Sequence, residues 1–331
     1  MLMGYGGLRF WNYGGIFERR QSYSAKALDC RATWRMIKTL ALPNKPGLNQ
    51  LKAKGAKMEL SIMQPDDWHL RLRDGDLLEA VISHRGIVIP NLKPPFKTTA
   101  AVVAYQESIL KTLPANSDFI PLMTLYLTDT TTPEEIKLAR DSGVVYAVKL
   151  YPAGATTNSQ YGVTDLFGKC LPVLEEMVKH NMPLLVHGEV TDPEVDIFHR
   201  ERVFIDTVLR PLIQKFPPLK VAMEHVTTAD AVRFDLLQQP SRRNILFLIE
   251  ISFFKEDCSH TITALKLQAI VSAVTSGCKR FFLGTDSAPD ERRQKRMFQL
   301  KRAGALDKLE AFTSFNGPDF YGLPRNTSKI K

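Results

Sequence analysis

Two kinds of segment alternate along the chain from Met58 onward. Short apolar or β-branched runs, typical of buried strands, occupy residues 59–63, 86–91, 118–127, 144–152, 183–190, 220–226, 244–253 and 280–286. Segments with apolar residues at helical spacing separate most of them, at 98–113, 133–142, 166–181, 204–216, 228–239 and 264–276. Eight strands with intervening helices predict an α/β fold of the (β/α)8 TIM-barrel type. A doubly wound open sheet is the alternative, but no glycine-rich phosphate-binding sequence follows the first strand.

Polar side chains recur where the predicted strands end. They are His69, Asn91, Lys149, His187, His225 and Asp286. Each has an ordinary explanation by itself, such as a hydrogen-bonded core histidine or an aspartate that caps a turn. In a barrel, however, the carboxyl ends of all strands meet at one rim, where active sites are built.

Three histidines, a lysine and an aspartate at one rim predict a shared metal site. Neutral imidazoles and carboxylates suit zinc, which makes water nucleophilic at neutral pH, so the pattern points to metal-assisted hydrolysis. Lys149 does not fit as it stands, because an ammonium group has no lone pair to offer a metal. It fits only if it is modified or neutralised.

Positive charge is concentrated at the N-terminus. Residues 1–57 contain 11 Lys and Arg but only Glu18 and Asp29, and this excess accounts for the net charge of +9 of the whole chain. The remainder is neutral, which argues against nucleic-acid binding. No apolar run reaches the roughly 18 residues of a membrane span.

The basic, acid-poor segment 1–57 reads as an organellar transit segment, with a mitochondrion favoured over a plastid. A wrongly assigned start is the alternative, since Met36 and Met58 could each begin a shorter chain. We expect residues 58–331 to form the catalytic domain.

Several longer motifs are specific enough to indicate a family. They are "PDDWHLRLRDGD", "IPNLKPP", "MTLYLTD", "VKLYPAGATTNS", "MPLLVHGEVTD", "MEHVTT", "FLGTDSAP" and "AFTSFNGPDFYGLP". In this order they resemble the dihydroorotases of the bacterial and plant type, within the amidohydrolase superfamily. The resemblance implies reversible interconversion of N-carbamoyl-L-aspartate and L-dihydroorotate in pyrimidine synthesis, at two zinc ions bridged by a carboxylated lysine and a hydroxide.

The resemblance also implies roles for the metal-site residues. Lys149 resembles the carboxylated lysine, which would turn its ammonium into a carbamate. His187 and His225 resemble ligands of the second zinc. His69 and Asp286 resemble ligands of the first zinc, and Asp286 also the group that moves the proton.

Four further residues resemble the family's substrate site. Arg73 and Asn91 are similar to the pair that binds the substrate carboxylate, a task that suits a planar bidentate donor. Thr156 and Thr157 resemble residues of a loop that closes over the substrate, although a Gly- and Thr-rich stretch is also typical of a plain connection.

The chain departs from the family pattern in the metal motif itself. The family has His-x-His, whereas this sequence has His69 followed by Arg71. A guanidinium cannot be deprotonated to bind a metal, so one ligand of the first zinc is missing and that site is expected to be weak.

Other departures lie near the predicted substrate site and loops. Asp290 stands where the family has a substrate-binding histidine, the segment between Ala80 and Gly86 is short, and "ERRQKRMFQLKR" replaces a longer loop. Residues 242–268 do not resemble the family's seventh-strand region. We therefore expect an incomplete barrel around the seventh strand and after the eighth.

Three functions stay open at this point. The first is a dihydroorotase with impaired activity, acting on a small molecule and able to exist as a homodimer. The second is another cyclic-amide hydrolase such as a dihydropyrimidinase, against which Arg73 and Asn91 argue because they suit an acidic substrate. The third is a catalytically dead paralogue that acts by binding or assembly.

Overall fold

The computed structural model describes residues 61–72, 85–115, 117–237, 244–250, 270–286 and 306–330. The proposed leader 1–57, Arg73 and Asp290 lie outside the described residues.

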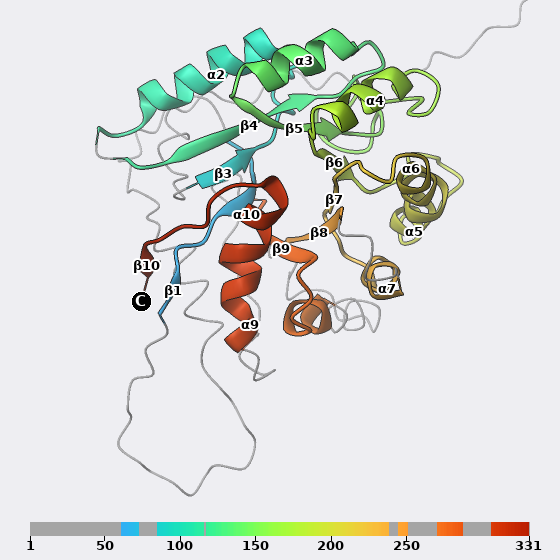
Figure 1. The fold of residues 1–331 in the computed structure, drawn as a ribbon. Coiled ribbons are helices and arrows are strands. Elements are labelled where there is room, and N and C mark those ends of the chain that lie inside the picture. Colours follow the sequence, from blue (N-terminus) through green and yellow to red (C-terminus); the bar gives the residue numbers. More distant parts are fainter. Residues whose placement is uncertain are drawn as a thin grey trace, which may run out of the picture.

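Eight parallel strands form the centre of the molecule, in the order of the sequence (Figure 1). They are β2 (Asp67–Leu70), β3 (Arg85–Val88), β4 (Ile120–Tyr126), β5 (Val145–Leu150), β6 (Leu184–His187), β7 (Val221–Glu224), β8 (Ile245–Glu250) and β9 (Phe281–Gly284). Each strand pairs in parallel with the next. The first and last strands, β2 and β9, also lie in contact, so the sheet curls into the predicted barrel.

Alternation along the strands divides the core into two layers. One cluster fills the barrel interior and includes Ala147 and Tyr151, whereas the other lies between strands and helices and includes Val148 and Leu150. Because successive side chains of a strand point to opposite faces, Lys149 points into the barrel between Ala147 and Tyr151.

Helices surround the strands, and α2, α3 and α4 lie over the part of the barrel formed by β3 to β6 (Figure 1). The helical elements are α2 (Thr99–Thr112), α3 (Pro133–Asp141), α4 (Leu171–Lys179), α5 (Arg200–Phe204), the π-helical η2 (Ile205–Leu209), α6 (Arg210–Lys215), α7 (Ala229–Leu237), residues 270–275, α9 (Leu306–Glu310), the π-helical η5 (Ala311–Phe315) and α10 (Asn316–Tyr321). Threonine side chains start two of them: Thr98 accepts from the Ala101 N–H, and Thr132 from the Glu135 N–H. Among the described helices, none is both long and apolar enough to cross a bilayer.

One predicted helix begins later than its apolar pattern suggested. The pattern placed its start at residue 166, whereas α4 begins at Leu171. Asp165 accepts a hydrogen bond from the Gly168 N–H at 2.8 Å, and this turn occupies the residues before the helix.

The first predicted strand was wrong. Residues 59–63 were expected in the barrel, but β1 (Ile62–Met63) pairs antiparallel with β10 (Lys329–Ile330), and the first barrel strand is "DWHL". Asp66 and Asp67 stand at the start of this segment. Both are buried because distant partners satisfy them: Arg85 donates to Asp66, and Thr285 donates to Asp67.

The seventh barrel strand, where the sequence departs from the family, is present as β8. It pairs with β7 through Ile245 to Phe247 and with β9 through Phe247 to Glu250. The unusual residues that follow it, 251–269, and those after β9, 287–305, are outside the described part of the chain.

Replacing Arg85 by Ala should lower the free energy of unfolding by about 3–5 kcal/mol, because the buried Asp66 carboxylate would lose its guanidinium partner. Arg85 is 6% exposed, and it also donates to the Pro324 carbonyl at 3.0 Å. Urea unfolding followed by circular dichroism measures the loss.

Arg202→Ala is the matched control, since Arg202 forms an exposed i,i+4 pair with Asp206 on the surface. It should change stability by about 0.5 kcal/mol or less. Equal losses in the two variants would contradict the role given to the buried pair.

Candidate functional site

The rim at the carboxyl ends of the strands collects the polar residues singled out in the sequence. His69 lies within β2, Lys149 is the fifth residue of β5 and His187 ends β6, whereas His225 directly follows β7 and Asp286 lies two residues after β9. His69, Lys149, His187 and His225 are all buried. Five strands therefore bring together the five residues expected at the metal site.

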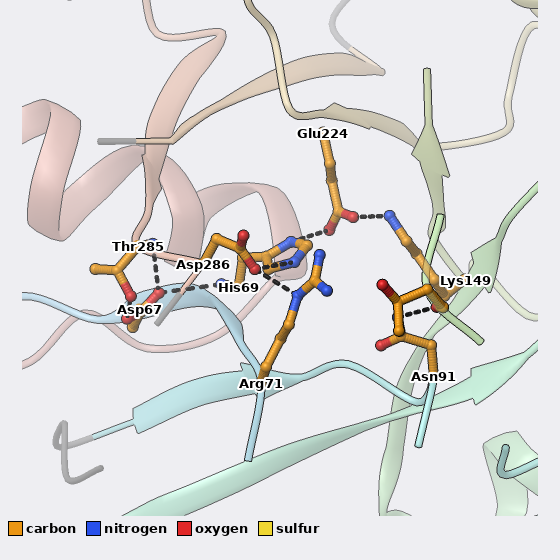
Figure 2. A network of polar contacts seen from close by, with 9 residues as sticks. Asp67, His69, Arg71, Asn91, Lys149, Glu224, Thr285 and Asp286 are labelled. Atoms are coloured by element: carbon orange, nitrogen blue, oxygen red, sulfur yellow. Dashed lines mark hydrogen bonds and ion pairs between the residues drawn. The ribbon is translucent and has the colours of Figure 1, made fainter. Parts of the chain in front are cut away.

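Glu224, the last residue of β7, lies between His69 and Lys149 (Figure 2). Lys149 Nζ donates to Glu224 Oε2, and His69 Nδ1 lies 3.3 Å from Glu224 Oε1. The three side chains have no solvent exposure. The carboxylate thus balances a fully buried ammonium and reaches an imidazole with its other oxygen.

The sequence prediction did not include Glu224. Its neighbour His225 was chosen as a ligand, and in an ideal strand adjacent residues face opposite sides. The available signal was Lys149, because a lysine predicted inside a barrel requires a negative partner.

Three imidazoles cluster beside Glu224. The ring centroids of His69 and His225 lie 4.7 Å apart, and those of His187 and His225 also 4.7 Å apart. Burial lowers the pKa of His187 to about 4 and that of His225 to about 3, and it holds the pKa of His69 well below its usual value. Nearby positive charge, Lys149 among it, acts in the same direction. The three rings are therefore neutral at physiological pH, which is the metal-binding form.

The donor set fits a divalent metal ion. Ligand atoms of His69, Glu224 and His225 all lie within 4.8 Å of one another. His187 Nδ1 is buried with no hydrogen-bond partner among the described residues. Neutral imidazoles beside a carboxylate are the donors that transition metals prefer.

Two of these residues adopt a backbone conformation that is unusual for their type. His225 has φ of 61° and Asp286 has φ of 44°, both in the left-handed region. Such conformations cost about 1–3 kcal/mol and persist where the surrounding structure enforces them, often at functional sites.

Arg71 forms an ion pair with one of the expected ligands. Its Nε donates to Asp286 Oδ1 at 2.5 Å, and the same oxygen lies 3.5 Å from His69 Nε2 (Figure 2). The Arg71 guanidinium thus neutralises Asp286 directly.

Three of the four expected substrate residues, Asn91, Thr156 and Thr157, lie on loops that contact one another, and Arg73 is outside the described residues. Asn91 Nδ2 donates to the Thr157 carbonyl at 3.1 Å, and Asn158 Nδ2 donates to the Asn91 carbonyl at 3.0 Å. Thr156 and Ser159 close the same loop by mutual hydrogen bonds. Asn91, Thr156 and Thr157 therefore belong to one connected structure.

Comparison with known proteins gives a consistent result. The model of the amidohydrolase family matches residues 67–331. The mitochondrial dihydroorotase of Arabidopsis thaliana is 57% identical, over 89% of this chain and 91% of the relative. The dihydroorotase of Nitrosomonas europaea is 48% identical, over 82% and 88%. The crystal structure of Saccharomyces cerevisiae dihydroorotase in complex with 5-fluoroorotic acid superimposes with a TM-score of 0.68 at 25% identity, covering 80% of this chain and 85% of that one.

The chain belongs to the amidohydrolase family, as its fold and its cluster of buried metal-binding side chains also indicate. Within that family it is a member of the dihydroorotases, which are cyclic amidohydrolases. The resemblance found in the sequence motifs is therefore confirmed.

Lys149→Met and Glu224→Gln should each destabilise the metal-free protein by about 3–5 kcal/mol, because either change leaves a buried charge without its partner. The double variant should lose clearly less than the sum of the two, with a coupling of about 1–3 kcal/mol. Urea unfolding in the presence of a chelator measures all four proteins, and strictly additive losses would contradict the ion pair.

Proposed function

We propose that this chain catalyses the dihydroorotase reaction, the reversible ring closure of N-carbamoyl-L-aspartate to L-dihydroorotate in pyrimidine synthesis. The observation that carries the proposal is the buried cluster of His69, His187 and His225 around Glu224 at the barrel rim, in a member of this family. The dihydroorotase relatives favour this reaction over that of a dihydropyrimidinase.

The metal we propose is zinc. Lys149, His187 and His225 would hold one ion, and His69 and Asp286 would contribute to a second. Lys149 would do so as a carbamate, since its ammonium has no lone pair. Bound zinc supplies Lewis acidity and makes water nucleophilic at neutral pH.

The protein groups would bind the substrate and move its proton. Arg73 and Asn91 would orient the substrate carboxylate, while Thr156 and Thr157 would cover it and limit the access of water. During ring closure the Asp286 carboxylate would accept the proton of the attacking carbamoyl nitrogen and return it to the departing carboxylate oxygen, which would leave as hydroxide. A second proton, taken up from solvent, would complete the water that is released.

Arg71 would weaken this machinery in two ways. It occupies the Asp286 carboxylate with a charged hydrogen bond, and it brings a positive charge to the place where the family binds the first zinc. We infer that the ion at Lys149, His187 and His225 is held more tightly than the other, and that turnover is slower than in relatives with His-x-His.

The Arg71–Asp286 ion pair also favours a second candidate function, binding of the acidic substrate or of another subunit without turnover. A protein that still binds the substrate carboxylate, but whose Asp286 is held by Arg71, would retain affinity for the substrate and lose catalysis. The assay of ring closure separates the two functions directly.

The chain as it stands should bind closer to one zinc than two, and Arg71→His should raise the content towards two. Ring-closing kcat/KM should rise about 10-fold or more, because an imidazole replaces the guanidinium and Asp286 is released. Atomic absorption and a steady-state assay of ring closure measure the two quantities.

Arg71→Gln is the control for charge alone, since it frees Asp286 without supplying an imidazole. It should raise the zinc content less than Arg71→His. Two tightly bound zinc ions and full activity in the unmodified chain would refute the impaired-site proposal.

We further propose that residues 1–57 direct the protein to the mitochondrion. Their excess of basic residues and the name of the Arabidopsis thaliana relative support this destination. A fluorescent reporter fused to these residues should enter mitochondria in plant cells. Changing Arg19, Arg20, Arg31 and Arg35 to Gln should reduce import, and import into plastids alone would contradict the proposal.

A further inference from the structure

Glu201, the second residue of α5, is a buried carboxylate with no part in the chemistry above. It is 5% exposed, yet both of its oxygens are fully engaged. Oε2 accepts from the Thr227 N–H at 3.0 Å and from its hydroxyl at 2.8 Å, whereas Oε1 accepts from the Thr228 N–H at 3.1 Å and from its hydroxyl at 2.5 Å. Burial raises the pKa of Glu201, and these four donors act in the opposite direction.

Thr227 and Thr228, which donate to Glu201, directly follow Val226, the neighbour of His225. His225 has a left-handed backbone, which a residue with a side chain adopts only when its surroundings hold it there. On the other side, Thr228 starts α7, because its hydroxyl accepts from the Ala231 N–H at 3.2 Å. Glu201 therefore fixes the short connection between His225 and a helix.

The same end of α5 is tied to the loop that follows His187. The Val190 N–H donates to the Arg200 carbonyl, and Arg200 Nε donates to the Val195 carbonyl, both at 3.4 Å. Glu189, in that loop, lies 3.7 Å from His187 Nε2. Residues 200 and 201 thus lie between two loops, one after β6 and one after β7.

We propose that Glu201 is a positioning residue for metal binding, which fixes the loop containing His225 against the loop that follows His187 so that the two imidazoles can share one ion. The geometry that it would preserve is the 4.7 Å separation of the His187 and His225 rings. Hydrogen bonds that orient ligands in this way affect metal affinity without contacting the metal. The proposal rests on the proposed zinc site for the identity of the ion.

Glu201→Gln tests this inference. The amide group presents an N–H₂ where one threonine needs an acceptor, so the hydrogen bonds from that threonine are lost while the size of the side chain is retained. The zinc dissociation constant should increase about 10- to 100-fold, measured by competition with a chromophoric chelator at a temperature where circular dichroism shows both proteins fully folded. In the ring-closing assay at subsaturating zinc, kcat should fall while KM changes less than about two-fold, since Glu201 lies outside the proposed substrate groups.

Glu194→Gln is the matched control, because Glu194 is an exposed carboxylate on the loop after β6. Its zinc affinity should equal that of the unmodified chain. Thr227→Val removes one hydroxyl donor and keeps the backbone N–H bond, so it should weaken zinc binding in the same direction by a smaller factor.

The outcomes separate the two proposals. A Glu201→Gln protein with a lower melting temperature but unchanged zinc affinity would show a structural role only and overturn this inference. If that variant does not fold, an unchanged affinity in Thr227→Val overturns it equally. An unmodified chain that binds no zinc would overturn both this inference and the proposed zinc site.

Discussion

A lysine buried inside the barrel is the constraint on which the site depends. Lys149 has no solvent exposure, and an unpaired ammonium in such an environment is too costly to persist. Glu224 supplies the opposite charge from β7, two strands away, and its second oxygen reaches His69 on β2. The Glu224 carboxylate therefore connects β7 with β5 and β2 at the rim. A carbamate on Lys149 would reverse the sign of its charge, so formation of the proposed zinc site requires this pair to rearrange.

Two other buried carboxylates hold the backbone next to the proposed ligands. Asp67 accepts from the Thr285 N–H at 3.0 Å, one residue before Asp286, and from the His69 N–H at 3.1 Å. Glu201 accepts hydrogen bonds from Thr227 and Thr228, which lie two and three residues after His225. Asp286 and His225 are also the two site residues with positive φ. At both places hydrogen bonds donated to a buried carboxylate offset the local strain.

The positive charge of Arg71 affects the balance of charge at the rim. With Arg71 present, the Asp286 carboxylate is bound by a guanidinium that is part of the protein, so a metal ion must compete with it. The charge of Arg71 also contributes to the lowered pKa of His69 and of His225, whereas the Asn91–Thr157 contact lies on other loops.

The sequence by itself determined the class of fold and most of the rim. Periodicity located seven of the eight barrel strands and the helices between them. The histidines, Lys149 and Asp286 follow or end these strands, and the carboxyl ends of parallel strands in a barrel all lie at one face, so the sequence placed these residues at that face. Only the tertiary structure decided which segment is the first strand, since the partners of Asp66 and Asp67 lie far away in the chain. It also decided that Glu224 neutralises Lys149, and that Arg71 binds Asp286 from a position 215 residues earlier. Pairings of this kind depend on strand register and closure of the barrel, which a pattern of hydrophobic and polar residues does not encode.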